Sequence, residues 1–499
     1  MQPPFAARCK NAAQAVSYNM GGHFLSRHPW KDGIGGTGGT APRIKQQDAR
    51  RNFWAPGLLG SLAGFLSSTG LFRPAPPLSH SGACSRPPLA EAKWPSIWAR
   101  SILADWTWTW SSVPVSAPFV LPSRMILKAW TIYTGSSGRL DLDPKSPLFT
   151  ERSFTWVASL TKLATTISIL QLVERGQLDL DADLRHLIPE LRDASILHEF
   201  DENDNPVIEA NAKPITMRQL LTHTSGFSYE FSDPVLLQWS RTQPNRNVSR
   251  LQWSKLEVTT PLRFAPGQSW GYGVGLDWAG QVLEALTGKS LGQYMQENIL
   301  DPVGLNDTGF WPERIPHTAP RTAQNVQRTK DGKLVAAHWP TPEKHEIESG
   351  GGGWFTTAND YALFLRAFLT GRLVSEETMR EMVKPQLNEA QAEFLRTIAF
   401  HPMVHNTFAP EFKPGTNIDH GLGGMLNVED VPGKRKAGSI AWSGILNSRW
   451  WVDPKTGIAG VLIVNVRPNG DPIVAKLYDE LELAVYGQLL GQAAVQSRI

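Results

Sequence analysis

The chain has 499 residues, of which 41% are hydrophobic and 19% are charged, an ordinary composition for a soluble globular protein. Its formal net charge is only +3, and its two cysteines, Cys9 and Cys84, lie within the first 125 residues. The remainder therefore cannot hold a disulfide framework or a thiolate-bound metal, and no uninterrupted apolar run reaches the roughly 18 residues of a membrane-spanning helix.

Charge divides the chain into two unequal parts. Residues 1–125 carry 13 Lys and Arg against four Asp and Glu, and are rich in Gly, Pro and Trp without a helical or strand period. We expect this segment to be an atypical leader, either disordered or translated from non-coding sequence, and not a signal peptide. The rest, with 36 basic and 42 acidic residues, gives no electrostatic basis for binding nucleic acid. A cytoplasmic protein that binds neither nucleic acid nor a membrane is expected.

The folded body begins with a strand and a long buried helix. Residues 125–134 are rich in β-forming side chains and predict one strand. Residues 157–175 are apolar on nearly every side, which predicts a buried helix with Gly176 as its C-cap. Residues 178–187 predict a short acidic helix or turn, which Pro189 closes.

Helices then alternate with turns until strands return near the C-terminus. Thr357 and Asp360 form a capping-box pattern, Asp301-Pro302 indicates a loop, and Lys455-Thr456-Gly457 indicates a hairpin turn. Strands at both ends of the body predict one sheet built from both ends, with a helical domain inserted between and a site at the junction. The expected helices cover residues 216–221, 276–286, 291–299, 361–369 and 477–490, and the expected strand arms cover 440–452 and 458–466.

Ser159 and Lys162 are the first candidates for chemistry. Residues three apart on a helix lie on one face, about a turn from each other. A serine hydroxyl is a poor nucleophile at neutral pH unless a base lies beside it, and a lysine can supply that base when its environment lowers its pKa. Taken alone, Ser159-x-x-Lys162 is a weak pattern, because most such pairs form the polar face of a helix.

The rest of the chain strengthens the pattern. Tyr272 follows Ser159 in Tyr-Gly-x-Gly-Leu-Asp-Trp-Ala-Gly, and Trp442-Ser443-Gly444 follows Tyr272, in the order used by serine penicillin-recognising enzymes. Together with the motifs listed below, these segments resemble the class C β-lactamase-related family, and within it the fungal lovastatin-type transesterases. The supporting motifs are Leu-Leu-Thr-His-Thr-Ser-Gly at 220–226, the glycine run at 350–353 with Trp-Phe-Thr-Thr, Gly-Leu-Gly-Gly at 421–424, Phe-Asp-Glu at 200–202, and Asn-Gly-Asp-Pro at 469–472.

This resemblance implies a β-lactamase/transpeptidase-like α/β fold over residues 126–490, with a central antiparallel sheet, flanking helices and an inserted all-helical domain. Ser159 would be the nucleophile, and Lys162 and Tyr272 would move its proton; which of the two takes the proton first stays open. The oxyanion hole would be formed by the backbone N–H groups of Ser159 and Ile445.

Two departures from the β-lactamase pattern bear on the substrate. Val274 stands where the pattern has asparagine, and Trp442 stands where it has lysine. These changes predict an apolar, uncharged wall, with Ser443 and Gly444 completing the substrate-binding strand and Gly444 letting the acyl group pass close. An ester or thioester of an apolar acid then fits better than penicillin.

Other sequence motifs give weaker evidence of a functional site. Gly288-Lys289-Ser290 lacks the earlier glycine of a phosphate loop, and the 350–353 glycine run indicates a bend beside the cleft. His401 and His405 have metal-like spacing without a third ligand, His223 fits a turn better than catalysis, and Ser225 lacks a G-x-S-x-G frame.

The sequence therefore predicts a serine acyltransferase that needs no metal or cofactor. It would pass an acyl group from a small-molecule thioester or ester, or from an acyl carrier protein, to an alcohol in fungal secondary metabolism. An esterase that uses water as acceptor, and a catalytically silent relative that only binds a ligand, remain the alternatives.

Overall fold

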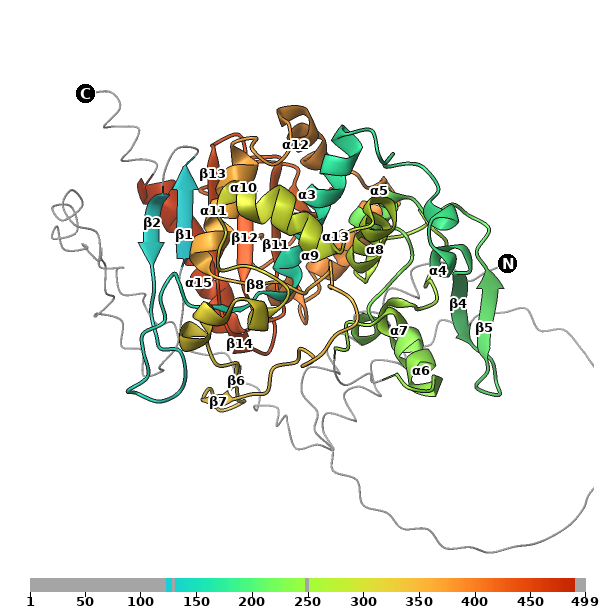
Figure 1. Cartoon of the computed structure of the whole chain (residues 1–499), viewed down its shortest axis with the longest axis horizontal. Helices are drawn as coiled ribbons and strands as arrows, with labels where there is room; N and C mark the ends of the chain where they lie inside the picture. The colour runs from blue at the N-terminus through green and yellow to red at the C-terminus, as the bar shows by residue number, and fades with distance from the viewer. Residues whose placement is uncertain (1–122, 128–130, 247–250, 490–499) are drawn as a thin grey trace, which may run out of the picture. The chain divides into compact units, whose positions relative to one another are not determined.

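The computed structural model describes residues 123–127, 131–246 and 251–489 (Figure 1). Most of the expected leader, with both cysteines, lies outside this part of the chain. The first described strand, Ser123–Leu127, already begins inside the segment that we expected to be the leader.

A seven-stranded antiparallel sheet forms the centre, in the order β2-β1-β13-β12-β11-β10-β9. Two of its strands come from the start of the described chain and five from its end, so the prediction of one sheet built from both ends is confirmed (Figure 1). The strand bounds are β1 Ser123–Leu127, β2 Thr131–Gly135, β9 Ile418–Gly421, β10 Gly424–Asn427, β11 Ser439–Ser443, β12 Arg449–Asp453 and β13 Ile458–Leu462.

The single strand expected over residues 125–134 is wrong. The structure divides it into β1 and β2, which pair antiparallel with Met125 opposite Tyr133, while β1 also pairs with β13. The intervening residues contain no Gly, Pro, Asn or Asp, so composition held no turn signal at that point. The turn Lys455-Thr456-Gly457 does join β12 to β13 as predicted, with the Thr456 hydroxyl donating to Asp453.

Alternating residues of the sheet face two different cores. Trp442, Trp450 and Val461 pack into the large core that also contains the helices α3 (Thr161–Glu174) and α11 (Ala358–Leu369). Trp451 faces the other side and packs edge-on against Tyr478 of α15 (Pro472–Ala484), with ring centroids 5.7 Å apart. Because side chains alternate along a strand, both faces of the sheet are covered, and Trp442 faces the core that contains α3.

The long buried helix is confirmed, with a different beginning. A 3₁₀ helix at Ala158–Leu160 precedes α3, and every side chain from Thr161 to Leu172 is buried. Gly176 ends the helix at φ +67°, where its N–H donates to the Val173 carbonyl. Ser159 therefore lies in a tight turn at the entrance to α3, not within the α-helix.

The helices expected at 216–221 and 276–286 are confirmed as α5 (Met217–Leu221) and α8 (Gly275–Thr287), capped by Thr216 and Gly288. Pro189 does not close a helix but begins α4 (Pro189–Arg192), because proline suits the first helical position.

The third expected helix is α9 (Leu291–Met295), which continues as a π-helix at Gln296–Leu300 and then as α10 (Asp301–Val303), where a loop was expected. The last expected helix begins earlier, at Pro472, and continues as a π-helix at Val485–Leu489.

The remaining described helices are short or peripheral. They are α6 Pro234–Thr242, α7 Lys255–Val258, α12 Glu376–Met382, α13 Glu389–Ala399 and α14 His405–Phe408, with 3₁₀ turns at Leu184–His186, Glu230–Ser232, Pro312–Arg314 and Pro316–Arg321.

The inserted part is not entirely helical. Strands β4 (Ser195–Phe200) and β5 (Pro206–Ala210) form an antiparallel ribbon, and Asp201 shapes its turn by accepting from the N–H groups of Asn203 and Asn205. A three-stranded sheet joins β14 (Val466–Arg467), β6 (Val326–Arg328) and β7 (Leu334–Ala336).

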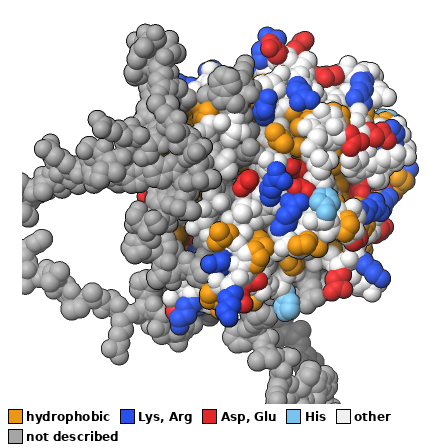
Figure 2. Space-filling model, turned by 60° about the vertical axis from the view of Figure 1, so that its left-hand side comes forward, with side chains coloured by type: hydrophobic (Ala, Val, Ile, Leu, Met, Phe, Trp, Pro, Cys, Tyr) orange, Lys and Arg blue, Asp and Glu red, His pale blue; other side chains and the backbone are white. Residues whose placement is uncertain are grey.

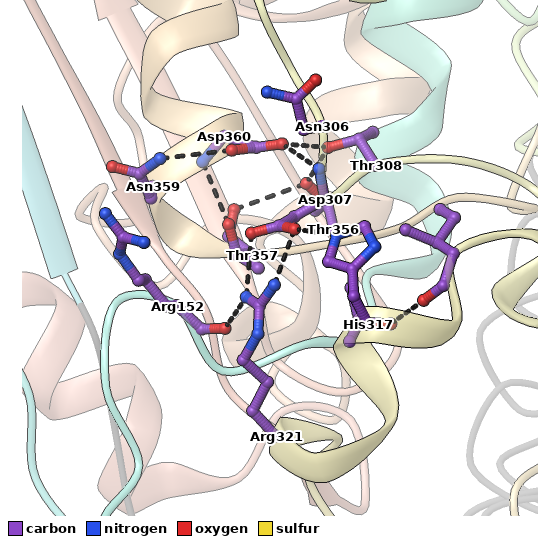
Figure 3. Close-up of polar contacts among 12 residues, drawn as sticks. Arg152, Asn306, Asp307, Thr308, His317, Arg321, Thr356, Thr357, Asn359 and Asp360 are labelled. Atoms are coloured by element: carbon purple, nitrogen blue, oxygen red, sulfur yellow. Dashed lines mark hydrogen bonds and ion pairs between the residues drawn. The ribbon is translucent and has the colours of Figure 1, made fainter.

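Asp360 does not complete the expected capping box. Thr357 does cap α11, since its side chain accepts from the Asp360 N–H, but the Asp360 carboxylate accepts from the Asp307 N–H at 2.8 Å and from the Thr308 hydroxyl at 3.1 Å (Figure 3). Thr308 also contacts Thr356 of β8 (Phe355–Thr356), and Arg321 pairs with Asp307. This polar cluster fixes β8, which pairs with β3 (Thr155–Trp156) just before Ser159.

None of the helices over the described residues combines the length and the apolarity needed to cross a bilayer. Figure 2 shows basic and acidic side chains interspersed with hydrophobic ones on one face, the usual surface of a globular domain.

Candidate active site

A strained turn presents Ser159. Ala158, the residue before it, has φ +48°, which costs a non-glycine residue about 1–3 kcal/mol and persists only where neighbours enforce it. The Thr161 hydroxyl donates to the Ala158 carbonyl at 2.7 Å and accepts from the Trp354 N–H at 3.0 Å. The backbone before Ser159 is therefore held by the first residue of α3, which is itself held by the residue that precedes β8.

Ser159, Lys162 and Tyr272 lie together. Lys162 Nζ donates to Ser159 Oγ at 3.2 Å, and the Tyr272 hydroxyl lies 2.7 Å from the same oxygen. Lys162 Nζ also lies 4.9 Å from the centre of the Tyr272 ring. The three side chains come from the 3₁₀ turn before α3, from α3 itself and from the loop before α8, and they form one hydrogen-bonded group around the serine oxygen.

Lys162 has two further partners that sequence reasoning missed. Its side chain is 2% exposed, and Nζ donates to the Tyr229 hydroxyl at 3.1 Å and to the Gly351 carbonyl at 2.7 Å. An ammonium group has three N–H donors, and three oxygens lie within reach of them. Burial holds the pKa of Tyr229 well above its ordinary value, so Tyr229 is a neutral phenol beside Lys162.

The glycine run lies beside this group, as predicted. Three consecutive carbonyls accept from side chains of β3 and α3: Gly350 from Thr165, Gly351 from Lys162, and Gly352 from Trp156. A Cβ on Gly350 would come within 2.4 Å of the Leu276 carbonyl. Glycine is needed because α8 packs directly against this backbone.

Aromatic rings enclose Tyr272. Trp442 is 6% exposed, and its indole Nε1 donates to the Tyr272 hydroxyl at 3.4 Å. Phe408 of α14 packs edge-on against Tyr272, with centroids 6.0 Å apart, and His223 does the same at 4.9 Å. Trp442 is therefore a hydrogen-bond donor to the phenol as well as part of an apolar wall.

His223 has the turn conformation that the sequence favoured, at φ +60°, yet its ring also packs against Tyr272 and against His420, with the two imidazoles 5.4 Å apart. Burial lowers the pKa of His223 well below its ordinary value, and a second positive charge beside His420 and Lys162 is also unfavourable. Burial also lowers the pKa of His420 to about 4. Both rings are neutral at physiological pH and add no charge beside Tyr272.

The segment after β11 approaches the serine turn closely. A Cβ on Gly444 would lie 2.6 Å from the Val157 carbonyl, so glycine is required here by the packing of β11 against the serine turn. The Gly444 N–H donates to Ser448, whereas the N–H groups of Ser159 and Ile445 donate to no other described residue. Two unused donors on adjoining segments are what an oxyanion hole requires.

Ser443 and Val274, which the sequence predicted to bind substrate, make contacts within the protein. The Ser443 hydroxyl donates to the Thr407 carbonyl at 3.2 Å and so anchors α14. Val274 is 5% exposed in the apolar core, and its carbonyl accepts from the Asp277 N–H at the start of α8. His401 and His405, with their metal-like spacing, direct Nδ1 to the backbone of Met403 and Ala399.

Comparison with known proteins relates this chain to acyltransferases and esterases. The family described as Beta-lactamase matches residues 126–484. A lovastatin esterase of Penicillium rubens is 34% identical over 342 residues, 66% of this chain and 84% of that protein. A monacolin J acid methylbutanoyltransferase of Aspergillus terreus is 33% identical over 340 residues, 66% of this chain and 81% of that protein.

Among solved structures, the unliganded selenomethionyl simvastatin synthase (LovD) from Aspergillus terreus matches with a TM-score of 0.67 and 29% identity, over 74% of this chain and 93% of that one. The resemblance and the β-lactamase/transpeptidase-like fold predicted from the motifs are thus confirmed. The chain belongs to the Beta-lactamase family of serine hydrolases and acyltransferases, and its relatives include fungal acyltransferases and an esterase.

Proposed function

We propose that this protein is a serine acyltransferase, which moves an acyl group from a thioester or ester to an alcohol through an acyl-enzyme on Ser159. The observation that carries the proposal is the hydrogen-bonded group in which Ser159 Oγ lies within 3.2 Å of Lys162 Nζ and 2.7 Å of the Tyr272 hydroxyl. An activated serine with a proton acceptor beside it is the requirement for nucleophilic acyl transfer.

The proton of Ser159 would pass to Tyr272. Lys162 is surrounded by oxygen acceptors, an arrangement that suits an ammonium, and a neighbouring cation favours the phenolate of Tyr272. As Ser159 Oγ attacks the acyl carbonyl, the N–H groups of Ser159 and Ile445 would bind the oxyanion, each contributing roughly 3 kcal/mol. Expulsion of the leaving thiol or alcohol, which takes the proton from Tyr272, would leave the acyl-enzyme. The acceptor alcohol would then give its proton to Tyr272 as it attacks the acyl-enzyme, and Tyr272 would return a proton to Ser159 Oγ as the new ester leaves.

The surroundings of the group favour an uncharged acyl chain. Trp442, Phe408 and the neutral His223 border Tyr272, and no charged side chain on β11 replaces the lysine of the β-lactamase pattern. By analogy with its relatives, the proposed substrates are a methylbutanoyl thioester, free or on an acyl carrier protein, and a polyketide alcohol such as monacolin J acid. A cytoplasmic location remains part of this proposal.

A fluorophosphonate probe tests the nucleophile. Labelling of the wild type that disappears in Ser159→Ala is expected. Ser168→Ala is the matched control, because Ser168 lies on α3, which follows the serine turn, and its hydroxyl donates to the Ala164 carbonyl. Labelling of Ser159→Ala at the wild-type rate would refute the proposal, and no labelling of either protein would favour the silent relative.

Transfer is separated from hydrolysis by supplying a methylbutanoyl thioester with and without monacolin J acid. Formation of the ester supports the transferase. The second candidate, an esterase, is favoured by the 34% identity to a lovastatin esterase. It predicts free methylbutanoate as the only acyl product and cleavage of added lovastatin.

A further inference from the structure

A buried carboxylate lies behind the lysine of the proposed site. Asp277 of α8 is 4% exposed, and its Oδ1 accepts from the Ser349 hydroxyl at 2.6 Å and from the Gly351 N–H at 3.0 Å. Gly351 is also the residue whose carbonyl accepts from Lys162 Nζ at 2.7 Å. One glycine therefore connects a buried acid to the buried lysine.

The contact between Asp277 and Gly351 is close enough to constrain the sequence. A Cβ on Gly351 would lie 2.4 Å from Asp277 Oδ2. The carboxylate thus packs directly on the glycine backbone and fixes the peptide whose oxygen faces Lys162. Leaving one charge of such a pair buried without its counter-charge is strongly unfavourable, so Asp277 and Lys162 stabilise each other's charged forms.

We propose that Asp277 is a positioning residue of the acyl-transfer site: its buried carboxylate holds the Gly351 carbonyl against Lys162 and balances the lysine charge beside Ser159. This inference rests on the function proposed above. Among the described residues, Asp277 makes no hydrogen bond to Ser159 or Tyr272. It acts through its hydrogen bond to Gly351 and through the electrostatic effect of its charge on Lys162.

Several titratable groups face this pair. Lys162 lies on α3, the phenols of Tyr229 and Tyr272 lie on either side of it, and Glu257 of α7 interacts with Asp277. Burial raises the pKa of Asp277, while Lys162 and the two hydrogen bonds oppose that rise. Burial raises the pKa of Glu257 to about 7, and the charge of Asp277 contributes to this rise.

Asp277→Asn tests the charge without removing the hydrogen bonds, because both bonds go to one oxygen that asparagine retains. Loss of a buried negative charge favours every neighbouring deprotonation, so Lys162 should release its proton at lower pH in this variant than in the wild type. Nitrogen-15 NMR of the lysine Nζ atoms follows the titration of Lys162 directly, and the signal is assigned by its loss in Lys162→Met. Because the method detects lysine nitrogen, a titration of Glu257 is not mistaken for that of Lys162. The pH profile of fluorophosphonate labelling should move toward lower pH by a similar amount.

Two variants serve as controls. Ser349→Ala removes one hydrogen bond but keeps the charge, and Asp360→Asn changes a buried carboxylate with the same kinds of partners in the cluster of Figure 3. Neither should move the Lys162 titration. An unchanged titration in Asp277→Asn, or an equal shift in Ser349→Ala, would overturn the inference. Failure of the proposed function would appear separately, as a wild type that the probe does not label while the lysine shift persists.

Discussion

Replacing Trp442 by phenylalanine isolates the indole hydrogen bond to Tyr272. The Trp442 Nε1 donor lies 3.4 Å from the Tyr272 oxygen, while the Trp442 ring packs against Tyr272, His223 and Phe408. Phenylalanine keeps an aromatic ring in the same enclosure but has no N–H. The variant therefore removes the donor that would stabilise Tyr272 as a phenolate.

The expected loss follows from the length of the bond. A hydrogen bond to a charged group contributes about 1.5–3 kcal/mol, and a separation of 3.4 Å places this one at the weak end. A loss of about 1.5 kcal/mol from the transition state corresponds to a roughly tenfold decrease in kcat. KM should change little, because the bond acts on the proton-transferring phenol.

Trp450→Phe is the matched control. Trp450 lies directly opposite Trp442 on β12 and is fully buried, but its indole nitrogen has no hydrogen-bond partner among the described residues. Both variants lose the same atoms from the same core, so their stabilities should fall alike in thermal unfolding. Acylation kinetics with a chromogenic short-chain ester should separate them. Equal kcat values for the two variants would refute a role for the Trp442 N–H.

Three further predictions follow from the same contacts. Tyr229→Phe removes an acceptor of Lys162 and should lower kcat about tenfold. Single-turnover acylation measures this change, and an unchanged kcat would contradict the prediction. Gly351→Ala forces a methyl group to within 2.4 Å of Asp277 and should lower the melting temperature. The control Gly332→Ala lies at an open turn with φ +84° and should cost only backbone strain of about 1 kcal/mol. Equal decreases in melting temperature for the two variants would argue against the close contact at Gly351. Because the folded-state pKa of Glu257 is raised from 4.5 to about 7, folding binds a proton between these values, and the free energy of unfolding should fall by roughly 3 kcal/mol as pH rises through that window. Urea titrations of the wild type and Glu257→Gln check this, since only the wild type should carry that component.

Local signals predicted much of the fold. The apolar run of α3 with Gly176 at its end, the cap at Thr357 and the turn after Asp453 depend on residues close in sequence, and each was predicted. The two-stranded ribbon β4–β5 was missed, because its hydrophobic alternation is weak and β5 is exposed along its whole length.

The residues of the candidate site likewise fall into those that the sequence predicted and those that it did not. Ser159 and Lys162 are a short-range pattern, and Tyr272 followed from the motif order. Tyr229 and Gly351 contact Lys162 across 67 and 189 residues, and nothing in their local sequence indicates that contact. Asp277 stood within a quoted motif, but its role depends on the packing of α8 against the glycine run, which only the folded chain shows.

The row of carbonyls at Gly350, Gly351 and Gly352 has a consequence for how such a site can diversify. A main-chain oxygen is a ligand that no single amino-acid exchange deletes, so the lysine keeps its anchor while surrounding side chains change. Selection for a new acyl chain or a new alcohol can therefore act on Phe408 and its neighbours without first rebuilding the reactive centre.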